Sequence, residues 1–330
     1  MPADDSAPPP ALSILSAAHD AEPHLAEMIE SVLAQTVRDW ELIVVDDGMS
    51  DEVVRIVDKY PDDRIRLLRQ EYGGLAGAVD AAAAVARGAY YAVQAGDGRL
   101  SPTFCERIGA VLAEHPEIDV LCVDALPFTD GEDRPPSFRQ RCGITEEPGV
   151  GHRVGLVEVI RHTGLYTTAA VRASTWRAAG GFRGDAPPVD SLAMCLRILA
   201  AGHDLRVLPE QLGHYRVHPD NLDDAPPDWN TYDAGVQRAF GQLTTLTDDP
   251  QVLAEVHRTL RTHRYESALR MAREALRNSD HATARRHAWR ALTLRPALRP
   301  ALLWLVLRVA PGGLDRLKAA KGRLAGLRGR

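Results

Sequence analysis

Apolar and polar residues alternate in two patterns over the first 220 positions. Short apolar runs predict buried strands, and segments whose apolar residues recur at three- and four-residue spacing predict helices. Strands that alternate with helices predict an α/β fold, with a mostly parallel sheet and crossover helices. The predicted strands are 12–15, 41–45, 65–68, 89–93, 119–123, 166–171, 205–208 and 212–217, and the predicted helices are 23–35, 51–60, 73–87, 102–114, 173–179 and 191–201.

Two later parts of the chain depart from this alternation. Residues 125–165 lose clear periodicity and are rich in proline and glycine, which indicates a functional loop or a lid. From Trp229 onward the pattern is helical, and segments within 265–296 resemble paired antiparallel helices that are too few for a solenoid. We therefore expect three parts, which are a disordered arm at 1–10, an α/β domain at 11–225 and an α-helical domain with a basic tail at 226–330.

Charge is distributed unevenly along the 330 residues, whose formal net charge is −6. Residues 251–330 contain 18 Lys+Arg against 5 Asp+Glu, whereas residues 1–250 contain 21 against 40. Residues 316–328 space leucines and basic residues as in an amphipathic helix, so the basic end is either a membrane-surface helix or the solvated face of a packed bundle. The acidic first part argues against nucleic-acid binding.

Cysteine usage and hydropathy bear on the compartment. The four cysteines are scattered without CxxC spacing, as free thiols in a reducing compartment are. No apolar run reaches the roughly 18 residues that a membrane span needs, and the first residues do not resemble a signal peptide. We expect a cytoplasmic protein, with peripheral contact to the inner face of the membrane if the basic end is a membrane-surface helix.

The strand at 89–93 ends in the polar turn Gln94-Ala95-Gly96-Asp97-Gly98. Ligands of open α/β sheets bind beyond the carboxyl ends of the strands, where the Asp97 carboxylate can hold a divalent cation against a phosphate. An ordinary strand-to-helix turn fits the same residues. The first strand-to-helix turn lacks GxGxxG, which argues against NAD binding, and Gly73-Gly74 fits either a phosphate-binding helix start or a loop.

Seven segments, taken in order, resemble the family 2 glycosyltransferases of the GT-A fold. Members of this family are inverting enzymes that use a nucleotide-sugar, usually a UDP-sugar. The resemblance covers about residues 11–222, and each segment is weak alone but the set is specific. The segments are 12–20, 30–36, 40–48 (Trp-Glu-Leu-Ile-Val-Val-Asp-Asp-Gly), 69–75, 180–182 (Gly-Gly-Phe), 189–197 and 214–218.

The resemblance implies a donor site at the strand ends. Asp47, alone or together with Asp46, would hydrogen-bond the nucleobase, and Asp46 fits a turn or cap residue equally well. The turn at 17–20 would line the same pocket with backbone groups. The implied nucleotide-sugar site comprises Ala17, His19, Asp46, Asp47, Gly74, Gln94, Gly96, Asp97 and Arg216.

Residues 94–97 stand where family members carry Asp-x-Asp-Asp, and Gln94 and Gly96 replace the first two acids. The acid that matches Gly96 usually holds the ribose, and the one that matches Asp97 usually binds Mn²⁺ or Mg²⁺. One carboxylate together with the donor phosphates can still bind such a cation, with lower affinity. We therefore expect a degenerate metal site, with His218 as a second candidate ligand.

The resemblance also implies a general base. Asp190 matches the acid that removes the proton from the acceptor hydroxyl, with Val189 in place of the usual preceding Glu. Asp190 also fits the N-cap of the helix at 191–201, and the two roles are compatible. Arg216 would contact the diphosphate, while His218 fits either a metal or phosphate contact or a structural role.

Two functions of different classes follow from these residues. The first is an inverting transferase that moves a sugar to a glycan, a lipid-linked intermediate or a natural-product acceptor. The second is a non-catalytic partner subunit that binds a nucleotide-sugar or glycan. Family members commonly carry Ala-Arg-Asn where this chain has Ala-Val-Asp at 78–80, so Val79 is a further departure. The departures at Val79, Gln94, Gly96 and Val189 favour the second function, and the retained Asp97, Asp190 and Arg216 favour the first.

Overall fold

A computed structural model describes residues 8–18, 20–129, 132–144, 149–161, 168–217 and 229–309. The chain forms two compact units, Met1–Leu253 and Ala254–Arg330. The division falls later than the boundary at 225/226 that the sequence predicts. The reason is that helix α9 (Trp229–Leu246) packs against α8 (Asp190–Ala200) in the first unit.

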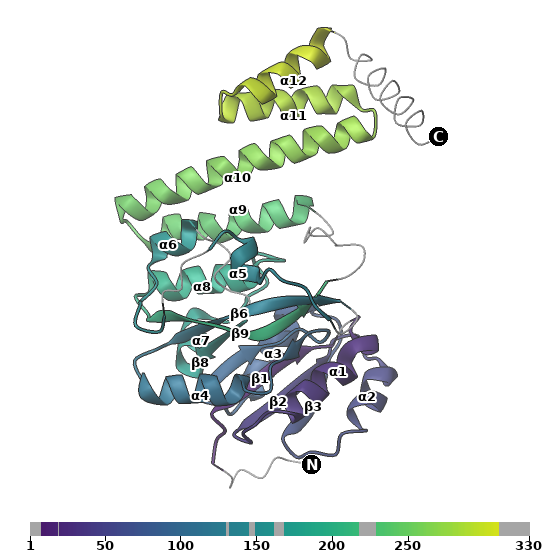
Figure 1. The fold of residues 1–330 in the computed structure, drawn as a ribbon, viewed down its shortest axis with the longest axis vertical. Helices are drawn as coiled ribbons and strands as arrows, with labels where there is room; N and C mark the ends of the chain where they lie inside the picture. Colours follow the sequence, from purple (N-terminus) through teal and green to yellow (C-terminus); the bar gives the residue numbers. More distant parts are fainter. Residues whose placement is uncertain are drawn as a thin grey trace. The chain divides into compact units, whose positions relative to one another are not determined.

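The strands and helices of the first 115 residues follow the predicted order, with the two-residue strand β5 added between β4 and α4 (Figure 1). The helix predicted at 51–60 ends three residues earlier than expected, at Val57. Ser50 is its N-cap, because the Ser50 side chain accepts from Glu52 N at 3.3 Å. The elements are β1 (Leu12–Ala17), α1 (Glu22–Leu33), β2 (Trp40–Asp46), α2 (Asp51–Val57), β3 (Ile65–Arg69), α3 (Gly74–Val85), β4 (Tyr90–Val93), β5 (Arg99–Leu100) and α4 (Phe104–Glu114).

The second half of the first unit differs from the sequence prediction in two places. The region expected to be irregular from 125 onward starts inside a strand, because β6 runs to Thr129. The strands predicted at 205–208 and 212–217 are one strand, β9, whose pairing with β6 shifts register beside Asp124. The elements are β6 (Val120–Thr129), β7 (Glu132–Asp133), α5 (Phe138–Arg141), α6 (Leu156–Arg161), β8 (Thr168–Arg172), α7 (Ala173–Ala179), α8, β9 (Leu205–Arg216) and α9.

The described strands form one sheet in the order β3-β2-β1-β4-β8-β6-β9-β5, with β7 paired to β6. Strands β1 to β4 run parallel, which places Leu15 beside both Ile43 and Val93. β8 runs antiparallel to both of its neighbours, β4 and β6, so the sheet is mixed and not wholly parallel. The carboxyl ends of β1, β2 and β4 consequently meet at one edge.

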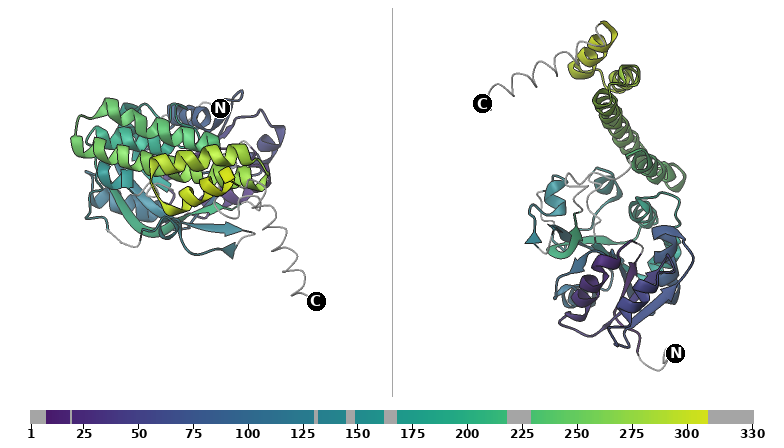
Figure 2. Two further views of the ribbon diagram at one scale, coloured as in Figure 1. Left: turned by 90° about the horizontal axis from the view of Figure 1, so that it is seen from above. Right: turned by 90° about the vertical axis from the view of Figure 1, so that its right-hand side faces the viewer.

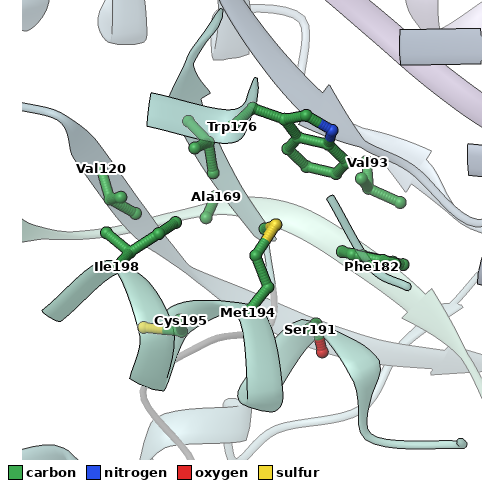
Figure 3. A pocket seen from close by; sticks show the side chains of 10 residues that line it. Val93, Val120, Ala169, Trp176, Phe182, Ser191, Met194, Cys195 and Ile198 are labelled. Carbon is green, nitrogen blue, oxygen red and sulfur yellow. The ribbon is translucent and has the colours of Figure 1, made fainter. Parts of the chain in front are cut away.

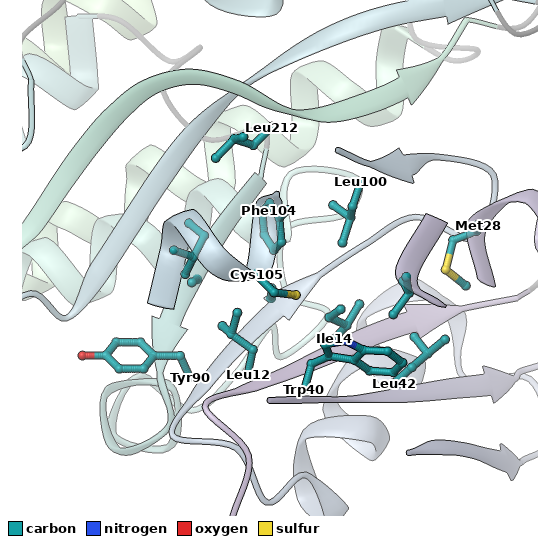
Figure 4. Packing of buried hydrophobic residues seen from close by; sticks show 14 of the residues in the cluster. Leu12, Ile14, Met28, Trp40, Leu42, Tyr90, Leu100, Phe104, Cys105 and Leu212 are labelled. Carbon is teal, nitrogen blue, oxygen red and sulfur yellow. The ribbon is translucent and has the colours of Figure 1, made fainter. Parts of the chain in front are cut away.

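Helices α1 and α4 cover an apolar face of this sheet, as the close view of the packing shows (Figure 4). Trp40 is almost fully buried there among the leucines of β1 and β2, and Phe104 and Cys105 of α4 pack beside it. Burial raises the pKa of the Cys105 thiol to about 12, so this thiol is protonated at neutral pH. None of the four cysteines, all of which lie in the described part of the chain, forms a disulfide, as predicted.

Glu41 is a fully buried carboxylate at the amino end of β2. Its Oε1 accepts from Ser13 Oγ and from Arg87 N, both at 2.6 Å. Its Oε2 lies 3.3 Å from Arg87 Nε and 3.4 Å from Arg66 Nη1. The Ser13 hydroxyl in turn accepts from Gly88 N at 2.8 Å. This network joins the chain after α3 to the first two strands, opposite the edge where their carboxyl ends lie.

The second unit is helical, as predicted, and is drawn from two further directions in Figure 2. α10 (Pro250–Arg277) enters it from the first unit and is followed by α11 (His281–Leu294) and α12 (Leu298–Val309). Asp280 begins α11 by accepting from Thr283 N at 3.0 Å. Ala275, Ala284 and Leu307 form the buried centre. None of the described helices is long and apolar enough to cross a membrane.

Candidate active site

The chain segments after β1, β2 and β4 lie side by side at the carboxyl edge of the sheet. The main chain continues the strand pairing there, since Gln94 N donates to Leu15 O at 2.9 Å. Ala17 ends β1 at this edge, whereas His19 lies outside the described residues. Turns gathered in this way are the usual ligand site of an open α/β sheet.

Asp46, the last residue of β2, shapes the turn that follows it. Its Oδ1 accepts from Gly48 N at 3.3 Å and from Ser50 N at 2.9 Å, and its Oδ2 pairs with Arg69 Nε at 3.0 Å. Both carboxylate oxygens therefore have partners within the protein. These contacts are those of a turn residue, so a contact between Asp46 and a nucleobase stays a prediction.

Asp47 is 1% exposed and differs from Asp46 in its second oxygen. Its Oδ1 accepts from Gln70 Nε2 at 2.6 Å and from Gly73 N at 2.8 Å. Its Oδ2 is buried and has no hydrogen-bond partner among the described residues. Gly74 follows with φ +71° and opens α3. The carboxylate is thus held on one side and leaves one acceptor oxygen unused.

The turn after β4 packs closely against the end of β1. Gln94 is buried, and its side-chain amide donates to Ala95 O at 3.3 Å. A Cβ at Gly96 would lie 2.6 Å from Ala17 O and 2.8 Å from Ala21 Cβ. The backbone at residue 96 therefore leaves no space for the acid that the family carries at this position.

Gly96→Ala is expected to destabilise the fold by about 1–3 kcal/mol, because the added methyl group overlaps a main-chain oxygen. Urea denaturation would measure this loss. Gly109→Ala is the matched control, since a Cβ at Gly109 in α4 meets nothing within 4 Å and alanine favours a helix. Equal urea midpoints for Gly96→Ala and the unaltered protein would show that the two turns are not in contact.

Arg216, at the end of β9, lies beside Asp97. Arg216 Nε donates to the Asp97 main-chain oxygen at 3.1 Å. The guanidinium also forms an ion pair with Glu27 of α1, and the Arg216 side chain is 9% exposed. Arg216 therefore lies next to the turn at 94–98 and is paired with a carboxylate, and its contact with a diphosphate stays a prediction. His218, the other candidate at this end, lies outside the described residues.

Sequence reasoning missed a group of side chains around Arg216. The guanidinium carbons of Arg99 and Arg216 lie 4.3 and 4.5 Å from the centroid of the Phe128 ring. Arg99 also pairs with Asp133 at 2.6 Å and with Glu27 at 3.6 Å. These residues come from α1, β5, β6, β7 and β9, so no local sequence pattern could indicate the group.

The described residues do not fit a metal ion held by the protein alone. The described residues contain no group of three or more His, Cys, Asp and Glu that could bind one. Asp97 is the one acid left by the degenerate motif, and the backbone at Gly96 has no space for a second. A hard cation takes six or more oxygen ligands, so a single carboxylate would need the donor phosphates and water to complete the shell.

Asp190 is a 4% exposed carboxyl group at the start of α8. Burial raises the pKa of Asp190 above its usual range and the nearby Asp185 adds to the rise, while a hydrogen bond from Ala186 N at 3.0 Å opposes it. The expected N-cap role is wrong, because α8 begins at Asp190 itself and Val189 occupies the cap position without a side-chain bond. No helix-capping role therefore explains the carboxyl group.

The turn that leads to Asp190 is held from two sides. Asp80 of α3 accepts from Phe182 N at 3.0 Å and from Arg183 N at 3.2 Å. Arg197 of α8 is buried and donates to Gly181 O from the other side. These contacts fix the start of α8 relative to α3. The first residue of α3, Gly74, directly follows Gly73, which donates to Asp47.

A cavity of about 60 Å³ lies between the sheet and α8 (Figure 3). Val93, the last residue of β4, and Ser191, which follows Asp190, both line it. The cavity therefore lies between the strand that leads into 94–97 and the helix that carries Asp190. The other lining residues are Val120, Ala169, Val171, Trp176, Phe182, Met194, Cys195 and Ile198.

Known protein sequences are similar to this chain over the same region. Residues 13–163 match the family described as "Glycosyl transferase family 2". The putative glycosyltransferase EpsH of Bacillus subtilis is 25% identical over 217 residues, which cover 63% of this chain and 61% of EpsH. The glucosyltransferase WfgD of Escherichia coli, which uses UDP-Glc and α-D-GlcNAc-diphosphoundecaprenol, is 42% identical over 82 residues, covering 24% of this chain and 32% of WfgD. The matched region spans 21–61% of the length of the first four curated relatives.

Solved structures share the fold at low sequence identity. Staphylococcus aureus TarS (residues 1–349) in complex with UDP has a TM-score of 0.61 and 17% identity, over 93% of this chain and 91% of that one. The mannosyltransferase PcManGT of Pyrobaculum calidifontis, in complex with GDP-Man and Mn²⁺, has a TM-score of 0.59 and 18% identity, over 96% and 87%. The mixed α/β sheet and these neighbours agree on the GT-A fold, and residues 13–163 of the chain are similar to glycosyl transferase family 2.

Proposed function

We propose that the protein is an inverting glycosyltransferase that moves a sugar from a UDP-sugar to a hydroxyl group of a glycan, lipid-linked or natural-product acceptor. The observation that carries this proposal is Asp190, a buried carboxyl group with a raised pKa and no helix-capping role. A cavity lined by Val93 of β4 and Ser191 of α8 lies between that helix and the end of β4. Perturbed carboxyl groups of this kind are typical of general acids and bases.

In the proposed reaction Asp190 accepts the proton of the acceptor hydroxyl while that oxygen attacks the anomeric carbon. The bond between the anomeric carbon and the diphosphate oxygen breaks as the new glycosidic bond forms. The nucleoside diphosphate leaves with the electron pair, and attack from the opposite side inverts the anomeric configuration. Because Ala186 N binds one carboxylate oxygen, the other remains to take the proton.

Asp47 supports a nucleotide-sugar whose base is planar and carries an N–H group that can donate a hydrogen bond. Its unpartnered Oδ2 is an acceptor, and an unmade hydrogen bond of a buried carboxylate costs more than an ordinary one. Tyr72, next to Gly73, is 70% exposed and offers an aromatic face. Uracil fits both features, and the donor that WfgD uses is also a uridine nucleotide.

A thermal-shift titration tests the donor site and its metal. We expect UDP to raise Tm, as binding to the folded state must. Mn²⁺ alone is expected to leave Tm unchanged, because Asp97 is one ligand, whereas Mn²⁺ with UDP should raise Tm more than UDP with EDTA. A shift by Mn²⁺ alone in the Asp97→Asn variant would reveal a metal site elsewhere in the chain.

The second candidate function is a partner subunit that binds a nucleotide-sugar without turnover. The closed backbone at Gly96 and the ion pair between Arg216 and Glu27 favour it, because both leave less for a diphosphate to bind. The two functions differ in turnover, so hydrolysis-corrected release of UDP from a panel of UDP-sugars and acceptors separates them. Binding of UDP together with no release of UDP from any UDP-sugar, whichever acceptor is added, would support the partner subunit.

The basic C-terminal part is proposed to hold the protein at the inner face of the membrane. Residues 310–330 lie outside the described part of the chain, and their sequence carries six Lys+Arg against one Asp. Juxtamembrane basic segments are attracted to anionic lipids by about 1 kcal/mol per residue near the surface. Such a location would suit an acceptor carried on a lipid.

A further inference from the structure

The outward face of α12 is apolar and exposed. Its exposed residues follow one another at spacings of four, three, one and three positions, which places them on a single side of a helix. Exposed apolar patches of this kind mark interaction sites. The stripe consists of Leu298 (78% exposed), Leu302 (55%), Leu305 (49%), Val306 (38%) and Val309 (75%).

The opposite side of α12 already has its packing partners. Leu307 is 1% exposed and packs, with Leu303, against Ala275 and Ala284 of the two preceding helices. Among the described residues of this helical unit, the stripe is therefore not part of the buried core. α12 has 12 residues and is too short to cross a bilayer, so it would have to lie along a surface.

Two tryptophans extend the stripe onto α11. The Trp289 and Trp304 rings lie 5.1 Å apart, and Trp289 is 50% exposed. The Arg308 guanidinium lies 5.1 Å from the Trp304 ring. Tryptophan beside arginine and leucine is the composition of helices that lie at a membrane–water interface.

The charge of this region selects the partner. Residues 281–309 contain six arginines and no Asp or Glu, and residues 310–330 continue the same bias. A second copy that docked stripe to stripe would place like charges against one another. An anionic lipid surface instead offers both an apolar layer for the stripe and negative headgroups for the arginines.

We propose that the stripe on α12, together with Trp289 and Trp304, docks on anionic lipid bilayers with the helix in the plane of the interface. The inference rests on the proposed membrane contact of the basic C-terminal part and identifies the folded surface that makes it. The leucine and valine side chains enter the boundary between headgroups and acyl chains, and the arginines stay with the headgroups.

Co-sedimentation of the full chain with vesicles tests the proposal. Vesicles of phosphatidylcholine with phosphatidylglycerol are expected to bind about tenfold or more tightly than phosphatidylcholine alone, and added salt should weaken the binding. Leu302→Glu and Leu305→Glu are each expected to weaken it about tenfold, because each places a charge in the apolar layer. Leu246→Glu, on α9 and 43% exposed, adds the same charge elsewhere and should bind like the unaltered protein.

Three results would overturn the proposal. The first is equal affinity for the two vesicle types, or no binding to either. The second is equal binding by Leu302→Glu and Leu246→Glu. The third is a dimer that forms without lipid and that Leu302→Glu converts to a monomer, because it would assign the stripe to a second copy. The assay contains no sugar donor, so a failed glycosyl-transfer assay leaves the vesicle result intact.

Discussion

Asp190→Asn is expected to lower kcat for glycosyl transfer by about 10²–10⁴-fold while leaving the affinity for UDP unchanged. The amide retains the size of the side chain and can still accept from Ala186 N, so the turn before α8 should keep its shape. The amide is not a base for the acceptor hydroxyl. Steady-state kinetics and UDP titration of the two proteins would measure the split.

The pH dependence gives a second signature of the same residue. Proton acceptance requires the ionised carboxylate, so kcat/KM should rise with pH through the pKa of Asp190. Burial raises the pKa of Asp190, and the acidic limb therefore lies at higher pH than for an ordinary aspartate. The limb should be absent in Asp190→Asn. Asp185→Asn should keep kcat and move the limb to lower pH, because the Asp185 charge contributes to the rise.

Stability should move in the opposite direction to activity. Because the pKa of Asp190 is higher in the folded state, its stabilising effect is complete below the unfolded pKa and is lost as pH rises through the folded pKa. At neutral pH the ionised group destabilises the fold, so Asp190→Asn should raise the free energy of unfolding by about 0.5–2 kcal/mol, a gain that vanishes in acid.

In the kinetic comparison, an unchanged kcat of Asp190→Asn together with retained UDP binding would rule out Asp190 as the base.

Glu41→Ala is expected to destabilise the first unit by about 3–5 kcal/mol, the largest loss that we expect from a single carboxylate away from the catalytic edge. The substitution leaves Ser13 Oγ and Arg87 N without their acceptor and removes the partner of two arginines. Urea denaturation would measure the loss. Glu114→Ala, at the exposed end of α4, is the control and should stay within about 0.5 kcal/mol.

The effect of Glu41 depends on pH with a defined sign. Although burial alone would raise the pKa of Glu41, the bonds from Ser13 and Arg87 together hold it below the ordinary value of 4.5. Its ionised form therefore stabilises the fold above pH 4.5, and this contribution is lost as pH falls through the folded pKa. Glu41→Gln should match the unaltered protein in strong acid and fall behind it at neutral pH. Equal stability of the two proteins at neutral pH would show that the network contributes nothing.

Local patterns were sufficient for the elements but not for their pairing. The apolar run at 41–45 and the period of 23–35 each identify an element within a few residues of its observed bounds. The break expected at 125 was wrong, because β6 continues by pairing with β9 along a bulge, and such pairing is set by a distant segment. The antiparallel β8 is another case, since strand direction depends on the path of the chain between strands.

The candidate site shows the same division. The sequence indicated Asp47, Asp97, Asp190 and Arg216, because each occupies a recognisable motif position. It did not indicate Glu27, which reaches Arg216 from α1 across 189 positions. It also did not explain Gly96, whose reason is the oxygen of Ala17 on another strand. Close contacts between segments that are distant in the chain produce no recognisable pattern in the sequence of either segment.

The sequence by itself thus determined the alternation of strands and helices, the degenerate turn at 94–97 and the basic C-terminal part. Hydrophobic period, turn residues and charge act locally, so they can be recognised without coordinates. Only the tertiary structure decided that Asp190 is buried without capping its helix, that Asp47 keeps one oxygen unpartnered, and that α12 exposes an apolar stripe. Burial and hydrogen-bond satisfaction depend on which distant segments meet, and the turn at Gly96 is closed for the same reason.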